Sequence, residues 1–266
     1  MPTPPRLTAM GRLALLFLVT CGTWASEVDP QFHLFLLIGQ SNMAGRGVPD
    51  AESREVDPRV LMLDREQRWV PAQDPLHFDK PEAGVGPGLA FGKQLAAADS
   101  RVRIGLIPCA VGGTSIARWV PGAFDPATKT HPYDDMLVRA KAALGQGVLK
   151  GILWHQGEAD RGKTASYPED LTALVQRLRG DLATPEVIVL AGELAAFTPK
   201  QEAATTAFNA TLHGLTGKIP RFDVVSAANL QHKGDHLHFD TASARTLGIR
   251  FAEVMVRLQQ SNNPAP

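Results

Sequence analysis

A serine follows an apolar run near the amino-terminal end of the chain, in surroundings that suit a nucleophile. The run LFLLIG ends at Gly39, and Ser41 stands two residues later in a turn of small residues. Small residues let the backbone turn sharply, so that a hydroxyl and its own amide N–H are both exposed. The motif alone fits equally well an ordinary turn whose serine caps a helix. The segment predicts a strand that ends at a candidate nucleophile.

A carboxylate and an imidazole stand three residues apart near the other end, in the segment GDHLHFD. At this spacing Asp235 and His238 lie on one side of a turn, so that the two side chains can meet. A serine hydroxyl needs a general base, and the base needs a partner that fixes its tautomer. Ser41, His238 and Asp235 can fill these three roles. A metal site in this segment would need further ligands, and the cysteines offer none. Acyl transfer through a serine with these partners requires neither a metal nor an organic cofactor, and none is expected.

Five blocks of residues carry a wider signal. They are GQSNMAG at 39–45, GPGLAFGKQLA at 86–96, GGTSIARW at 112–119, WHQGEAD at 154–160 and DHLHFD at 235–240. With these five blocks in this order, the chain resembles the SGNH (GDSL-like) hydrolase superfamily. Within that superfamily it resembles the sialate O-acetylesterase and carbohydrate esterase family 6 group. The resemblance covers about residues 32–258. It implies a flavodoxin-like fold and a serine esterase that removes O-acetyl groups from carbohydrates through an acetyl-serine intermediate.

Ester hydrolysis by a serine also needs donors for the negative oxygen of the tetrahedral intermediate. The candidates are the N–H of Ser41, the N–H of Gly112 or Gly113, and the side-chain amide of Gln156. The superfamily generally places Asn at the third position. This chain has Gln there, as the sialate esterase and family 6 group does.

Three other residues are candidates for roles in the site. Glu158 could orient His238 in place of Asp235 or together with it, and the spacing of three residues favours Asp235. Arg118 and Trp119 are candidate substrate contacts, because a guanidinium and an indole suit sugar hydroxyls, a carboxylate or a pyranose face. The alternative for both is packing within a loop.

The elements that must position these residues follow an α/β pattern. Helical patterns alternate with five short apolar runs, at 34–38, 102–107, 151–154, 187–190 and 222–226. This alternation predicts a three-layer, doubly wound sandwich around a five-stranded parallel sheet. In such sheets the site lies outside the carboxyl ends of the strands, which is where the blocks fall.

Two helices are predicted with a buried face. One spans 166–182 and could begin with a capping box of Ser166 and Glu169, and the other spans about 241–258. The segments 46–87 and 113–132 are rich in Pro and Gly and mostly aperiodic. They are expected to be loops that shape a cleft.

Composition limits the classes of protein that fit. A chain of 266 residues with 44% hydrophobic content can build one sizeable core, so we expect a single esterase domain over residues 26–266. The 27 basic and 27 acidic residues cancel, which leaves no excess of positive charge for a phosphate backbone. Nucleic acid is therefore not an expected partner. The composition does not indicate an oligomeric state.

The first residues resemble an export signal. Two arginines precede the apolar run LALLFLVTC at 13–21, and Thr23-Trp24-Ala25 resembles a cleavage site. We predict a signal peptide over residues 1–25 and a secreted or periplasmic protein, with lipid attachment at Cys21 as the alternative. The run is too short to span a bilayer permanently, so no stable membrane span is expected. Cleavage would leave Cys109 as the one cysteine, without a disulfide.

Two rival functions use the same residues. A lipase or thioesterase would apply the same machinery to acyl chains, but it would need a long apolar groove. A noncatalytic carbohydrate-binding protein would not need Ser41, His238 and Asp235 together. These residues are compatible with both acetylated sialic acid and acetylated xylan-type polysaccharide as substrates.

Overall fold

A seven-stranded sheet forms the middle layer of the computed structural model, which describes residues 1, 3 and 28–261. The strand order is β3-β2-β4-β1-β5-β6-β7. The strands are β1 (Asp29–Gly39), β2 (Val60–Leu63), β3 (Trp69–Pro71), β4 (Arg103–Pro108), β5 (Gly147–His155), β6 (Ile188–Gly192) and β7 (Phe222–Val225). Strand β3 pairs antiparallel with β2, and the other neighbours pair in parallel.

The prediction of a five-stranded parallel sheet is therefore wrong in strand number and in strand direction. The five predicted runs correspond to β1, β4, β5, β6 and β7. The two additional strands lie inside 46–87, which was expected to be loop. They have four and three residues, too few for a periodic pattern to emerge. Strand β2 joins the sheet because its apolar residues can be buried beside β4.

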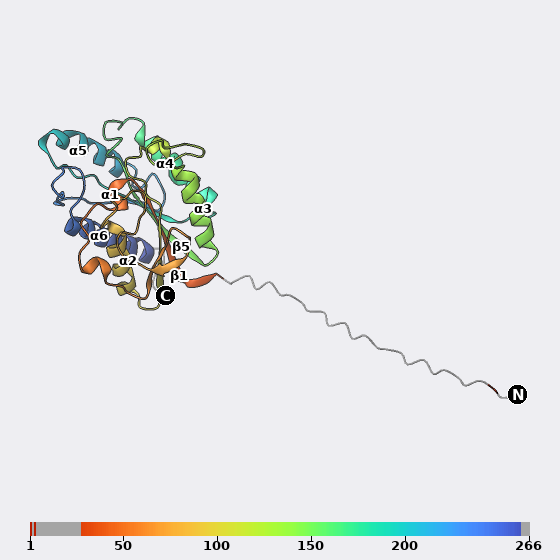
Figure 1. The fold of residues 1–266 in the computed structure, drawn as a ribbon. Helices are drawn as coiled ribbons and strands as arrows, with labels where there is room; N and C mark the ends of the chain where they lie inside the picture. Colours follow the sequence, from red (N-terminus) through yellow and green to blue (C-terminus); the bar gives the residue numbers. More distant parts are fainter. Residues whose placement is uncertain (2, 4–27, 262–266) are drawn as a thin grey trace.

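Helices cover both faces of the sheet (Figure 1). On one face lie α2 (Pro87–Ala98) and α6 (Thr241–Gln260), and on the other lie α3 (Pro132–Leu144), α4 (Tyr167–Asp181) and α5 (Pro199–His213). Alternate residues of β1 point to opposite faces. Leu34, Leu36 and Ile38 belong to the core under α3, α4 and α5, and Phe35 and Leu37 to the core under α2 and α6. This is the expected three-layer arrangement, because a strand buried on both faces is apolar throughout.

The two predicted helices correspond to α4 and α6, but only one is capped by a side chain. Ser166 has helical backbone angles and makes no side-chain cap hydrogen bond, so the predicted capping box does not form. At the start of α6 the Asp240 carboxylate accepts a hydrogen bond from the Ser243 N–H at 2.7 Å. This cap fixes the end of the segment that carries His238.

The carboxyl ends of three adjacent strands bring three of the blocks together, those at 39–45, 112–119 and 154–160. Gly39 at the end of β1 lies opposite His155 at the end of β5, and Leu37 lies opposite Pro108 at the end of β4. The short helix α1 (Ser41–Ala44) and the 3-10 turn Ile116–Arg118 follow β1 and β4 at this edge, and another 3-10 turn, Glu52–Arg54, precedes β2.

The predicted cleavage site and Cys21 lie outside the described residues. Among the helices that are described, none combines the length and the apolar character needed to cross a membrane.

Candidate active site

Ser41 begins a short helical turn directly after β1. Gly39 has a φ of 129°, and a Cβ atom there would clash with the backbone oxygen of His155. Glycine therefore allows β1 to approach β5 this closely in that backbone conformation. Ser41 is 6% exposed, and it lines a cleft of about 450 Å³ at the carboxyl edge of the sheet.

The structure brings Ser41, His238 and Asp235 into one chain of hydrogen bonds. His238 Nε2 lies 3.0 Å from Ser41 Oγ. His238 Nδ1 lies 2.7 Å from Asp235 Oδ2. With the Nδ1 proton held by the carboxylate, Nε2 is the ring nitrogen free to accept the hydroxyl proton. This is the arrangement that a nucleophilic serine requires.

Asp235 is held in its ionised form. Partial burial opposes ionisation, but hydrogen bonds from the His238 N–H, the His238 ring and the Leu237 N–H outweigh it and lower the pKa of the carboxyl to about 2. The two backbone donors lie 2.8 Å and 3.0 Å from Asp235 Oδ1. The carboxylate thus both shapes its own turn and aligns the imidazole.

Asn42, which the sequence analysis did not single out, ties the nucleophile turn to the His238 segment. Its Oδ1 accepts from the Phe239 N–H at 3.0 Å, and its Nδ2 donates to the Leu237 oxygen at 3.1 Å. These bonds span the residues on either side of His238. The position of Asn42 directly after Ser41 was the only signal available in the sequence.

Glu158 lies in the cleft but does not hold the histidine. Its Oε1 accepts a hydrogen bond from Asn42 Nδ2, and the hydrogen bond at His238 Nδ1 is made with Asp235. The geometry thus favours Asp235 over Glu158 as the orienting acid.

Of the two glycines proposed as oxyanion donors, one is already engaged. The Gly112 N–H donates to Asp79 Oδ2 at 2.8 Å. Asp79 Oδ2 also accepts from Arg46 Nη2 at 2.7 Å, in an ion pair whose side chains are 3% and 2% exposed. Gly113 lines the same cleft as Ser41 and has a φ of 87°. The described hydrogen bonds use neither the Gly113 N–H nor the Ser41 N–H.

The structure does not bring the Gln156 amide to the cleft. Gln156 is fully buried, and its Nε2 donates to Asp160 Oδ2 at 2.6 Å and to the Thr114 oxygen at 3.1 Å. Its Oε1 accepts from the Tyr167 hydroxyl at 2.8 Å. Both ends of its amide are thus engaged by protein groups, and the structure does not place Gln156 in the cleft beside Ser41, where the expected oxyanion donor would lie.

The two expected substrate contacts also lie elsewhere. Trp119 is fully buried, donates from Nε1 to Thr114 Oγ1 at 3.1 Å, and packs edge-on against Trp154. Arg118 donates to the Phe124 oxygen at 2.9 Å and does not line the Ser41 cleft. Both side chains thus make hydrogen bonds within the 113–132 segment.

Charged side chains surround the cleft beside Ser41. Lys80, Glu82 and Lys233 contribute charged side chains to it, and Leu237 is the one large apolar side chain in its lining. Such a lining offers hydrogen-bond partners for hydroxyl groups but no long apolar groove.

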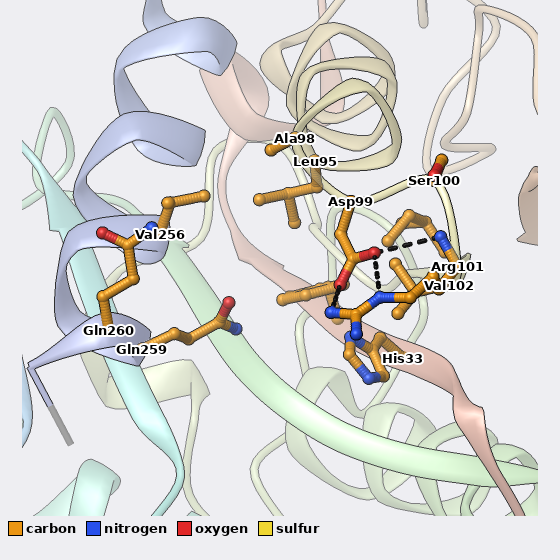
Figure 2. A pocket seen from close by; sticks show the side chains of 12 residues that line it. His33, Leu95, Ala98, Asp99, Ser100, Arg101, Val102, Val256, Gln259 and Gln260 are labelled. Atoms are coloured by element: carbon orange, nitrogen blue, oxygen red, sulfur yellow. Dashed lines mark hydrogen bonds and ion pairs between the residues drawn. The ribbon is translucent and has the colours of Figure 1, made fainter. Parts of the chain in front are cut away.

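Three further features of the described chain bear on other kinds of site. Among residues 28–261, no cluster of His, Cys, Asp and Glu could hold a metal ion. Burial raises the pKa of the Cys109 thiol to about 11, which disfavours the reactive thiolate. A hollow of about 540 Å³ lies at the opposite edge of the sheet, where β4 begins. Two of its lining residues, Asp99 and Arg101, form an ion pair at 2.8 Å and are drawn in Figure 2.

Known proteins resemble this chain over most of its length. A family model described as "Carbohydrate esterase, sialic acid-specific acetylesterase" matches residues 31–257. An Arabidopsis thaliana protein named "Probable carbohydrate esterase" is 34% identical over 251 residues, which cover 84% of this chain and 90% of the relative.

Solved structures show the same fold. The solved structure of a protein from Arabidopsis thaliana is 31% identical in sequence and has a TM-score of 0.75, and the match covers 86% of this chain and 99% of that chain. A carbohydrate acetylesterase from Xanthomonas citri is 18% identical, with a TM-score of 0.67 over 86% of this chain and 57% of that chain. At that lower identity the likeness concerns the fold alone.

Proposed function

Because the chain belongs to the sialic acid-specific acetylesterase family of carbohydrate esterases, and is therefore a carboxylic ester hydrolase, we propose that it removes acetyl groups from sugar hydroxyls through an acetyl-serine intermediate. The nucleophile is Ser41, the general base is His238, and Asp235 orients the base. The observation that carries this proposal is the chain of hydrogen bonds from Ser41 Oγ to His238 Nε2 and from His238 Nδ1 to Asp235 Oδ2.

The reaction proceeds in two acyl transfers. Ser41 Oγ attacks the acetyl carbonyl while its proton passes to His238 Nε2, and the carbonyl oxygen becomes an anion. The C–O bond to the sugar breaks, and the sugar oxygen takes the proton from His238. Water then attacks the acetyl-Ser41 carbonyl, gives a proton to His238, and releases acetate as that proton returns to Ser41 Oγ.

The cleft lining supports a sugar ester over a long-chain acyl ester. Lys80, Glu82 and Lys233 can pair with hydroxyl or carboxylate groups of a carbohydrate, whereas Leu237 is the one large apolar side chain present. An acetyl group needs no further apolar surface. Acetylated sialosides and acetylated xylan both meet these requirements. Acetate release from each of the two identifies the preferred sugar, and hydrolysis of short and long acyl esters shows the preferred acyl length.

We also propose that the protein is exported after cleavage behind Ala25, as the apolar run and the small residues around that site indicate. The N-terminal sequence of protein recovered outside the cytoplasm tests this. A start at Ser26 supports it, whereas a lipidated Cys21 at the N-terminus contradicts it.

Replacement of the nucleophile tests the proposed function. Ser41→Ala is expected to lower kcat for p-nitrophenyl acetate by about 10⁴-fold or more, because no other hydroxyl can replace it beside His238. The matched control is Ser166→Ala, an exposed serine without a side-chain cap hydrogen bond. Near-normal turnover by the Ser41 variant would remove Ser41 from the mechanism.

A further inference from the structure

We propose that the side-chain amide of Gln40, the residue before Ser41, is the side-chain donor to the oxyanion and takes the place expected of Gln156. The inference rests on the proposed function, since it names a further catalytic residue of that site. It assigns the Gln40 Nε2 hydrogens to the acyl oxygen, beside the N–H groups of Ser41 and Gly113.

The orientation of the Gln40 amide is fixed by what surrounds its oxygen. Oε1 accepts from Gln156 Nε2 at 3.2 Å, from the Gly157 N–H at 3.4 Å and from the Ala159 N–H at 3.4 Å. A backbone N–H can only donate, so the atom that faces Gly157 and Ala159 must be the oxygen. The NH2 group is therefore at the other side of the amide.

That other side opens on the cleft. Gln40 is 3% exposed, and it lines the cleft together with Ser41 and Gly113. The hydrogen bonds described for its side chain all engage Oε1. Some side-chain atoms nearby, such as Glu158 Oε2 and His155 Nδ1, are fully enclosed and have no hydrogen-bond partner. Gln40 Nε2 is not one of these enclosed atoms. A buried amide whose donor end meets the cleft is the feature expected of a preorganised oxyanion site.

Gln156 then becomes a positioning residue. The hydroxyl of Tyr167 and the carboxylate of Asp160 hold its amide at both ends, and its Nε2 reaches Gln40 Oε1. Locked in this way, Gln156 keeps the Gln40 oxygen turned away from the cleft and the Gln40 NH2 turned toward it. Gln156 thus supplies one of three donors to Gln40 Oε1, and the Gly157 and Ala159 N–H groups supply the other two.

Two substitutions at Gln40 test the donor. Gln40→Glu keeps the length and the acceptor oxygen but removes both N–H donors, and Gln40→Met removes the donors without adding charge. Both are expected to lower kcat for p-nitrophenyl acetate by about 10²-fold, with KM changed by less than about threefold, because the lost bond forms chiefly in the transition state.

The matched control is Gln156→Met, in the same hydrogen-bond network. It is expected to lower the melting temperature more than either Gln40 variant and to lower kcat by less than about tenfold, because Gly157 and Ala159 still hold Gln40 Oε1. Turnover of both Gln40 variants within about threefold of wild type, or a larger kcat loss in the Gln156 variant, would overturn the inference.

A wild-type measurement does not depend on how the variants fold. In a crystal structure of the Ser41 adduct with a p-nitrophenyl phosphonate, a phosphoryl oxygen is expected within about 3 Å of Gln40 Nε2. That oxygen beyond reach of Gln40, or bonded to Gln156 Nε2, would contradict the inference. Absence of acetyl-ester hydrolysis by the wild-type protein would instead refute the proposed function.

Discussion

At the residue scale, the site divides into contacts that sequence spacing can predict and contacts that depend on rotamers. Asp235 and His238 are three residues apart, so a turn alone brings them together. The orientation of the Gln156 amide depends on tertiary contacts, because its hydrogen bonds to Asp160 and Tyr167 determine which way it faces. A pattern of residue types gives no information about that choice, and this is why Gln156 was expected in the cleft.

The acid that serves the histidine can be identified by comparing two isosteric variants. Asp235→Asn should lower kcat/KM for p-nitrophenyl acetate by about 10³-fold or more, because an amide no longer fixes the tautomer in which His238 Nε2 is free to accept a proton. Glu158→Gln should lower it by less than about tenfold, since Glu158 bonds to Asn42. Equal losses would assign a shared role to the two carboxylates.

At the element scale, three loops from β1, β4 and the segment before α2 are tied together by one buried ion pair. Arg46 Nη1 donates to the Gly45 oxygen at 2.6 Å, and Asp79 accepts from both Arg46 Nη2 and the Gly112 N–H. Residues 46–87 therefore do more than line a cleft. The aperiodic sequence showed a loop there, but it could not show β2, β3 or this ion pair, because each depends on partners distant in the chain.

Loss of one partner of this ion pair should destabilise the protein. Arg46→Met leaves the Asp79 carboxylate buried without its cation, so the free energy of unfolding in urea should fall by about 3–5 kcal/mol. The double variant Arg46→Met/Asp79→Leu should recover most of that loss, since no unpaired charge remains. A single variant as stable as wild type would show that water or another group compensates Asp79.

At the scale of the whole molecule, the layered fold followed from the sequence more reliably than its edges did. Strands β1, β4, β5 and β6 each contain an apolar run that is buried between the helices on both faces, and burial of that kind leaves a strong pattern. Strands β2 and β3 lie toward one edge of the sheet and are too short to leave one. The chemistry lies near the middle of the sheet, where β4, β1 and β5 end side by side.

A buried carboxylate in the fold should make stability depend on pH. Asp74 is 9% exposed, and desolvation raises its pKa from 3.8 to about 7. The folded state thus binds this proton more tightly than the unfolded chain, so the stabilisation is full below about pH 4 and is lost as pH rises through about 7.

Asp74→Asn removes that titration. The free energy of unfolding of the variant minus that of the wild type should increase from pH 4 to pH 8. The increase should be at most about 4 kcal/mol, since each pKa unit corresponds to about 1.4 kcal/mol. The measurement is urea unfolding of both proteins across this range. A difference between the two proteins that is independent of pH would show that Asp74 ionises normally.

The most direct test of the account is to locate the covalent intermediate. The enzyme is mixed with p-nitrophenyl acetate, quenched in acid within the first turnovers, digested and analysed by mass spectrometry. We predict an acetyl group on the peptide that contains Ser41, and none on that peptide in Ser41→Ala. Continued turnover with the acetyl group on another side chain, or with none at all, would contradict the account.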